Sequence, residues 1–333
     1  MTDVRVNYLN IGLIASSCAL AFAWPFELFL FSYAVLGPAH YLTEIAWLHD
    51  RHYFVRPAAA RRAWLLVVGA TLAVVVYGIA VTLATGRTVD PRWEMGLFYL
   101  AFAAAFAAGL NASPRMQMLL AVVALAWLST MNEWRYYAVI AFFLITIIHV
   151  GLFTAAFMLY GALKSRSPSG LIALGVFVAC ASSFFLFVPA EGPPVSDTIR
   201  GIYRSFNALN AELLKLFGMG TGTSSREIYE SGEGIAVMRF IAFAYTYHYL
   251  NWFSKTSIIR WHEAAKRQAV WIAALWLVAL ALYLYDYTTG MTFLYSLSIL
   301  HVMLELPLNH QTMAGILAET SRVFARPSRS ADA

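Results

Sequence analysis

Two stretches of the chain place a histidine and a glutamate four residues apart within strongly apolar sequence. His40 precedes Glu44 in one stretch, and His301 precedes Glu305 in the other. Residues four apart share one face of a helix, so each pair can act on the same ligand. Because an ionisable side chain inside a membrane span is costly without a partner, both pairs indicate a buried site rather than a lipid-facing surface.

A proline accompanies each pair, Pro38 beside His40 and Pro307 just after Glu305. Proline lacks a backbone N–H and interrupts the hydrogen-bonding pattern of a helix. We expect both prolines to break their helices, free backbone carbonyls and help to shape a cavity.

Two further histidines, His149 and His248, also lie within apolar runs. Together with the two His–Glu pairs they supply up to four imidazole nitrogens and two carboxylates. Such donors suit Fe(II), Mn or Zn, whereas a softer metal would call for thiolates. The only cysteines, Cys18 and Cys180, lie in separate apolar runs and are expected to be small core residues. A haem held by two axial imidazoles is an alternative reading.

The composition indicates a polytopic, all-α membrane protein. Of the 333 residues, 60% are hydrophobic and only 12% are charged, which is far from an average soluble domain. The net charge of +5 fits the lysines and arginines of inner loops, so no nucleic-acid partner is expected.

Counting apolar runs of spanning length predicts about ten transmembrane helices in a single domain, residues 1–320. The runs cover 8–24, 26–48, 63–85, 93–111, 114–131, 136–162, 169–190, 234–253, 268–286 and 291–318. Lysine and arginine concentrate in alternate connections, which places both termini in the cytoplasm. The expected location is a bacterial-type inner or plasma membrane, crossed many times.

In this topology His40, His149, His248 and His301 fall at nearly one depth on four helices that run in the same direction. Taken singly, each would more often be a hydrogen-bonded core residue than a ligand. Burying four imidazoles together costs free energy that a bound metal, a haem or a proton path would offset.

The one long outer connection, 191–233, contains apolar residues that recur at helical spacing between 199 and 216, with charged residues on the opposite face. This pattern predicts an outer amphipathic helix on the membrane surface. The glycine-rich run 218–223 lacks the lysine and context of a phosphate loop, so it is expected to be a flexible linker. The basic tail, 321–333, is expected to be disordered and cytoplasmic.

The histidine motifs resemble those of the bacterial Brp/Blh family of integral-membrane β-carotene 15,15′-dioxygenases. The similarity consists of four short motifs in matching order, around His40, His149, His248 and His301. It implies a non-haem iron held by these four histidines and a carotenoid substrate. The chain departs from the family pattern at Tyr41, at Glu44, where the family usually has aspartate, and at Trp252, where it usually has a second histidine.

The combined hypothesis is an intramembrane, iron-dependent oxygenase or related oxidoreductase that uses O₂ on a hydrophobic lipid, with polyenes, carotenoids and isoprenoids first. Glu44, Glu305 and Tyr247 are the expected catalytic residues. The residues expected to support the metal ligands are Glu44, Glu305, Asn251, Asn309 and His310. The alternatives are a Zn-dependent lipid hydrolase, a bis-histidine haem protein and a proton-coupled transporter.

Overall fold

The computed structural model describes residues 3–86, 143–255 and 266–324, with a few further positions between 100 and 122. These residues are almost entirely helical, and they contain no β-strand. Six of the described helices are long and apolar enough to cross a membrane. The predicted all-α class is therefore confirmed, with six candidate membrane-spanning helices among the described residues.

Four of the described helices begin with a serine whose side chain accepts a hydrogen bond from the first turn of the helix. Ser167, for example, accepts a hydrogen bond from Gly170 N and starts α9 with Pro168 in its first turn. The elements are α1 (Asp3–Ala23), α2 (Pro25–Phe31), η1 (Ser32–Leu36), α3 (Gly37–Asp50), η2 (His52–Phe54), α4 (Ala58–Thr85), η3 (Phe143–Phe153), α8 (Thr154–Ser165), α9 (Pro168–Leu186), α10 (Asp197–Tyr203), η4 (Arg204–Phe206), α11 (Asn207–Leu216), α12 (Ser225–Tyr229), α13 (Gly232–Ser254), α15 (Lys266–Tyr285) and α16 (Tyr287–Phe324).

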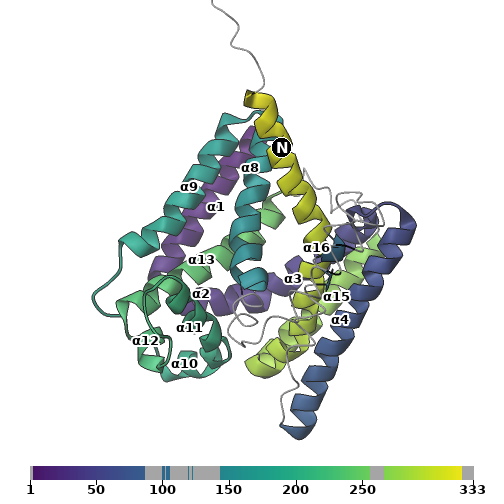
Figure 1. The fold of residues 1–333 in the computed structure, drawn as a ribbon. Helices are drawn as coiled ribbons and strands as arrows, with labels where there is room; N and C mark the ends of the chain where they lie inside the picture. Colours follow the sequence, from purple (N-terminus) through teal and green to yellow (C-terminus); the bar gives the residue numbers. More distant parts are fainter. Residues whose placement is uncertain are drawn as a thin grey trace, which may run out of the picture.

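Helix α13 is the centre of the fold, and most of its residues are buried. It packs against α1, α2 and α9 on one side and against η3 and α3 on the other. Figure 1 shows α1, α8 and α9 side by side and α4 and α15 apart from them, while α16 packs against both α8 and α15. Helices α4 and α15 leave most of their apolar surface exposed, as expected of helices that face lipid.

The start of α13 requires glycine because backbone from two other segments lies against it. A Cβ at Gly234 would collide with the carbonyl oxygen of Glu227 and lie 2.7 Å from that of Ile228. A Cβ at Gly232 would collide with the carbonyl oxygen of Pro189. The central helix can therefore begin this close to α12 and to Pro189 only because both positions lack a side chain.

The predicted count of ten spans is not confirmed. The runs 93–111 and 114–131, and the beginning of 136–162, lie largely outside the described residues. The run 26–48 forms three consecutive segments, α2, η1 and α3, of which η1 is a π-helical turn. The run 234–253 forms α13, which is not among the six candidate spans because tyrosines, His248 and Asn251 make it too polar.

The two prolines behave differently from each other. Pro38 lies in the first turn of α3, directly after the π-helical turn, so the helix changes type there. Pro307 lies inside α16, which continues through it as one helix of 38 residues. The predicted break at Pro307 is therefore wrong, although proline still leaves the carbonyl of Met303 without its helical donor.

The outer connection differs from the expected amphipathic helix on the membrane surface. It forms two helices, α10 and α11, joined by the turn η4. Its apolar side chains Tyr203, Leu209 and Leu213 are buried in the protein core. Figure 1 shows α10, α11 and α12 gathered at one end of the molecule, near α2. The predicted apolar helix face is present, but it packs against the protein core and not against the membrane surface.

The glycine-rich run after α11 is held by hydrogen bonds to Glu227, which differs from the flexible linker that we expected. The hydroxyl of Thr221 donates to both carboxylate oxygens of Glu227, at 2.9 and 3.1 Å, and Thr223 N donates at 3.0 Å. These bonds hold the pKa of the Glu227 carboxyl below its ordinary value, with the Thr221 hydroxyl as the main cause. Most of the predicted tail, 325–333, lies outside the described residues.

Candidate metal centre

The histidine of helix α3 faces its own glutamate across one helical turn. His40 Nε2 lies 3.0 Å from Glu44 Oε2, and both side chains are almost fully buried. The preceding π-helical turn sets the rotation of α3 relative to α2, and π-helical turns frequently mark functional positions. The predicted pairing on one helix face is therefore present in α3.

The glutamate of α16 contacts a histidine of another helix. Glu305 Oε2 lies 3.1 Å from His149 Nδ1, in an orientation that forms no hydrogen bond. His301 lies one turn before Glu305 on the same helix, and its Nε2 is 3.1 Å from His149 Nε2. His149 thus lies between the two residues that the sequence pairs with each other.

The four predicted histidines form one buried cluster. His248 Nε2 lies 3.1 Å from His40 Nε2, and one ring nitrogen from each of the four histidines lies within 4.8 Å of all the others. Their exposed fractions are 1% for His40 and His149, 2% for His301 and 7% for His248. The common depth predicted from the sequence therefore corresponds to contact in space.

Several neighbouring side chains fix the orientation of the imidazoles. Thr154 Oγ1 lies 2.8 Å from His248 Nδ1, which directs the other nitrogen of that ring toward the cluster. The ring of Tyr41 stacks on His301 with centroids 4.1 Å apart. Trp252 stands edge-on to His40 at 5.6 Å. These contacts restrict the rotation of the His40, His248 and His301 rings.

Buried polar atoms around the cluster lack hydrogen-bond partners. They are Nδ1 of His40, His149 and His301, one carboxylate oxygen each of Glu44 and Glu305, and both polar atoms of Asn309. Buried polar groups are normally satisfied, and each exception requires an explanation. No lysine or arginine of the described residues forms an ion pair with Glu44 or Glu305, so a cation would balance two buried carboxylates.

Two pairs of donor atoms have the spacing that ligands of a single metal ion require. A metal–nitrogen bond of about 2.0–2.1 Å places neighbouring ligands of one ion about 3.0–3.4 Å apart. The His40–His248 and His149–His301 nitrogen pairs are both 3.1 Å apart. The buried group of four histidines could therefore bind a metal ion, and its nitrogen and carboxylate donors fit borderline metals.

The remaining predicted residues lie around the cluster rather than in it. The hydroxyl of Tyr247 donates to Asn10 Oδ1 at 3.0 Å, and it also contacts the Oδ1 atom of Asn251 at 3.5 Å. Asn309 is buried one turn after Glu305. His310 is only partly buried and is not one of the clustered histidines. The catalytic role expected of Tyr247 stays a prediction.

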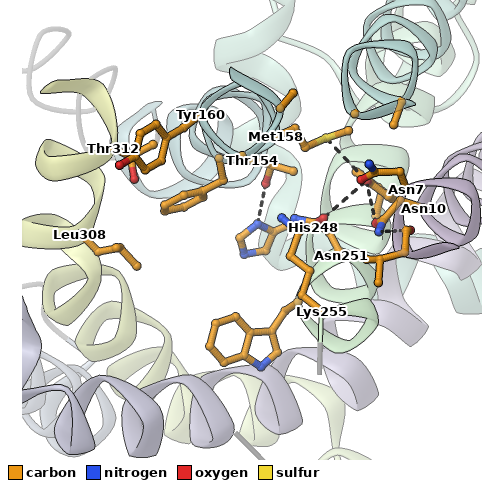
Figure 2. A pocket seen from close by; sticks show the side chains of 18 of the residues that line it. Asn7, Asn10, Thr154, Met158, Tyr160, His248, Asn251, Lys255, Leu308 and Thr312 are labelled. Carbon is orange, nitrogen blue, oxygen red and sulfur yellow. Dashed lines mark hydrogen bonds between the residues drawn. The ribbon is translucent and has the colours of Figure 1, made fainter. Parts of the chain in front are cut away.

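A cavity of about 600 Å³ adjoins the cluster. His40, Glu44, His248 and Glu305 line part of its wall, so the candidate centre opens into it. Figure 2 shows His248 and Asn251 of α13, with Lys255 just after that helix, on one side of the cavity, and Leu308 and Thr312 of α16 opposite. This volume is within the range of sites that hold small organic ligands.

Sequence reasoning missed Thr154, which forms a hydrogen bond with His248, and Asn10, which accepts a hydrogen bond from the Tyr247 hydroxyl. Thr154 follows His149 by five residues, and this spacing shares a face only across a π-helical turn such as η3. Asn10 is a lone polar residue in the first apolar run, and its burial could have been suspected from that position.

Comparisons of the chain with models of known protein families, with curated proteins and with solved structures found no match. The resemblance to the Brp/Blh family stays a prediction from the four histidine motifs.

Proposed function

We propose that the chain is an intramembrane, metal-dependent oxygenase that acts on a long apolar lipid. The observation that carries the proposal is the group of four buried imidazoles, with ring nitrogens within 4.8 Å of one another, among helices apolar enough to cross a membrane. A hydrocarbon chain has few reactive groups, and an iron ion held by such ligands would supply the O₂ chemistry needed to oxidise it.

In this proposal His40, His149, His248 and His301 hold the ion. Glu44 and Glu305 balance its charge. Glu305 lies 3.1 Å from Nδ1 of His149, the nitrogen opposite the one that faces His301, and can therefore orient that ring. Glu44 lies 3.0 Å from Nε2 of His40, the nitrogen that faces the cluster, so its carboxylate is placed to help hold the ion. Thr154 keeps one nitrogen of His248 directed at the centre. Burial of all six charged or ionisable side chains excludes bulk water from the reacting position.

Ring spacing favours a single ion over a haem. The ring centroid of His248 lies 4.7 Å from that of His40 and 4.7 Å from that of His149. A macrocycle needs a flat slot between its two axial imidazoles, and four imidazoles packed this closely leave little room for one. A zinc-dependent hydrolase would use the same ligands, so metal identity separates these two functions.

Metal analysis of the purified full-length protein tests the proposal. Wild type is expected to carry about one iron per chain, and His149→Ala and His301→Ala are expected to lose at least about 90% of it. His49→Ala is the matched control, because His49 is an exposed histidine outside the cluster. Equal metal content in all folded variants would remove the shared site.

Two further results distinguish the alternatives. Stoichiometric zinc would favour the hydrolase, and absence of any metal would favour the proton-coupled transporter. The carotenoid version is tested separately by expression in a carotenoid-accumulating host. Neither bleaching nor an aldehyde product there would exclude β-carotene while leaving an iron enzyme with another lipid substrate.

A further inference from the structure

The cavity beside the histidine cluster has a second, polar end. Its wall includes Lys164, Ser165 and Lys255 as well as Asn7. Lys255 follows His248 by seven residues at the end of α13, and Lys164 lies near the end of α8. Asn7 donates hydrogen bonds to Ser167 and Ser169 of the adjoining α8–α9 turn. The polar end therefore lies where these helices terminate.

Between the two ends the cavity is mainly apolar. Phe157, Met158 and Ala173 line it, and Trp252 and Leu308 line it from other helices. A volume of about 600 Å³ suits one extended chain better than a lipid with two chains. The apolar middle therefore favours a single hydrocarbon chain over a compact polar ligand.

The two lysines bring positive charge to the polar end without a carboxylate partner among the described residues. Lys164 Nζ lies over the ring of Tyr160, 5.5 Å from its centroid. Burial lowers the pKa of Lys255 to about 8, which means that its charge is poorly solvated. An anion at this end would supply the missing partner.

Carboxylates occupy the opposite end. Glu44 and Glu305 line the cavity beside the histidines, so their charge would repel an anionic group from the cluster. An amphiphile is therefore oriented in one direction, with its anionic group at the lysines and its chain toward the histidines.

We propose that the cavity binds a single-chain lipid with an anionic head group, which Lys164 and Lys255 hold while the chain extends to the histidine cluster. Seven to ten residues of helix separate the lysines from the level of His248, about 10–15 Å. Carbon–carbon bonds of about 1.5 Å advance an extended zigzag chain by about 1.25 Å per carbon, so the chain would meet the cluster about 8–12 carbons from its head. This inference rests on the proposed function for the fate of the chain, but binding itself requires no metal.

Displacement of a fluorescent fatty acid tests the inference. The full-length protein, in nanodiscs of zwitterionic lipid, is loaded with cis-parinaric acid and titrated with palmitate, hexadecyl phosphate and hexadecanol. Palmitate or hexadecyl phosphate is expected to compete at least about tenfold better than hexadecanol, because a charged head gains charge-assisted hydrogen bonds. The better of the two identifies the head as a carboxylate or a phosphate.

The double variant Lys164→Gln/Lys255→Gln is expected to weaken palmitate binding about tenfold or more and to bind hexadecanol as wild type does. Lys215→Gln is the matched control, because Lys215 is an exposed lysine of α11 that pairs with Glu212. Equal competition by hexadecanol, or unchanged palmitate binding in the double variant, would overturn the inference.

The test is independent of the metal. His149→Ala is expected to retain the preference for an anionic head even though it loses metal. Iron-loaded protein without this preference would overturn the lipid inference alone. Protein that prefers the anion but binds no metal would overturn the oxygenase proposal alone.

Discussion

Both nitrogens of the His248 ring have a defined neighbour. Thr154 Oγ1 lies 2.8 Å from Nδ1, and His40 Nε2 lies 3.1 Å from Nε2. In protein metal sites, a hydrogen bond on one nitrogen fixes which nitrogen faces the metal and raises its basicity. Thr154 should therefore contribute to metal affinity although it is not a ligand.

Thr154→Val keeps the shape of the side chain and removes its hydroxyl. We expect the metal dissociation constant to rise about tenfold, the lower end of the effect found when such partners are lost. Competition with a chromophoric chelator measures the change. Thr71→Val is the control, because Thr71 is a buried threonine of α4 that bonds only its own helix. Equal affinity in both variants would contradict the role assigned to Thr154.

The identities of the four clustered histidines could be predicted from the sequence. Each is an ionisable residue in an apolar run, where burial without a partner is costly. The pairing of Glu305 with His149 could not be predicted, because spacing along one helix does not fix contacts between helices. Thr154 was hidden for a related reason, since an α-helical period does not place it beside His149.

At the scale of elements, α13 depends on a close approach between backbones at its first turn. The carbonyl groups of Glu227 and Ile228 occupy the place that a Cβ on Gly234 would take. Helical propensity alone favours alanine over glycine by about 1 kcal/mol. At Gly234 the steric effect should outweigh that preference, because backbone cannot rotate away as a side chain can.

Gly234→Ala is expected to lower the free energy of unfolding by about 1–3 kcal/mol, the usual effect of overpacking. Gly175→Ala on α9 is the matched control, because a Cβ there meets no atom within 4 Å. It should be neutral or slightly stabilising. Thermal midpoints in one detergent provide the comparison, and equal midpoints for the two variants would contradict the packing argument.

The bounds of the helices were easier to predict than what packs against each helix. The apolar runs gave the helices that the structure describes to within a few residues at most ends, as α1 and α9 illustrate. Periodicity between 199 and 216 correctly marked an apolar face, but an apolar face has the same pattern whether lipid or protein covers it. The central position of α13 was equally hidden, because its polar residues resemble those of an interfacial segment.

At the scale of the whole molecule, the charge distribution predicts orientation. Lys164 and Arg166 lie at the α8–α9 turn, while α10 to α12 lie at the other end in Figure 1. From the positive-inside tendency we expect the α8–α9 turn to lie in the cytoplasm. The polar end of the cavity would then open toward the inner leaflet.

Single cysteines in a background lacking Cys18 and Cys180 test this orientation. We expect a membrane-impermeant maleimide to label Ser225→Cys in intact bacterial cells and Ser165→Cys only after permeabilisation. Both serines are exposed, so access to the reagent rather than burial decides the result. The reverse pattern would invert the topology, and labelling of both in intact cells would contradict a membrane between them.

The origin of the histidines in widely separated helices has a consequence for biosynthesis. Helix α3 emerges early from the ribosome, whereas α16, with His301 and Glu305, is made after the other helices of the cluster. A nascent chain would therefore expose an incomplete set of donors until α16 enters the membrane. Loading of an ion would be a late event, and a chain that has acquired one would have α3 and α16 joined through a shared centre.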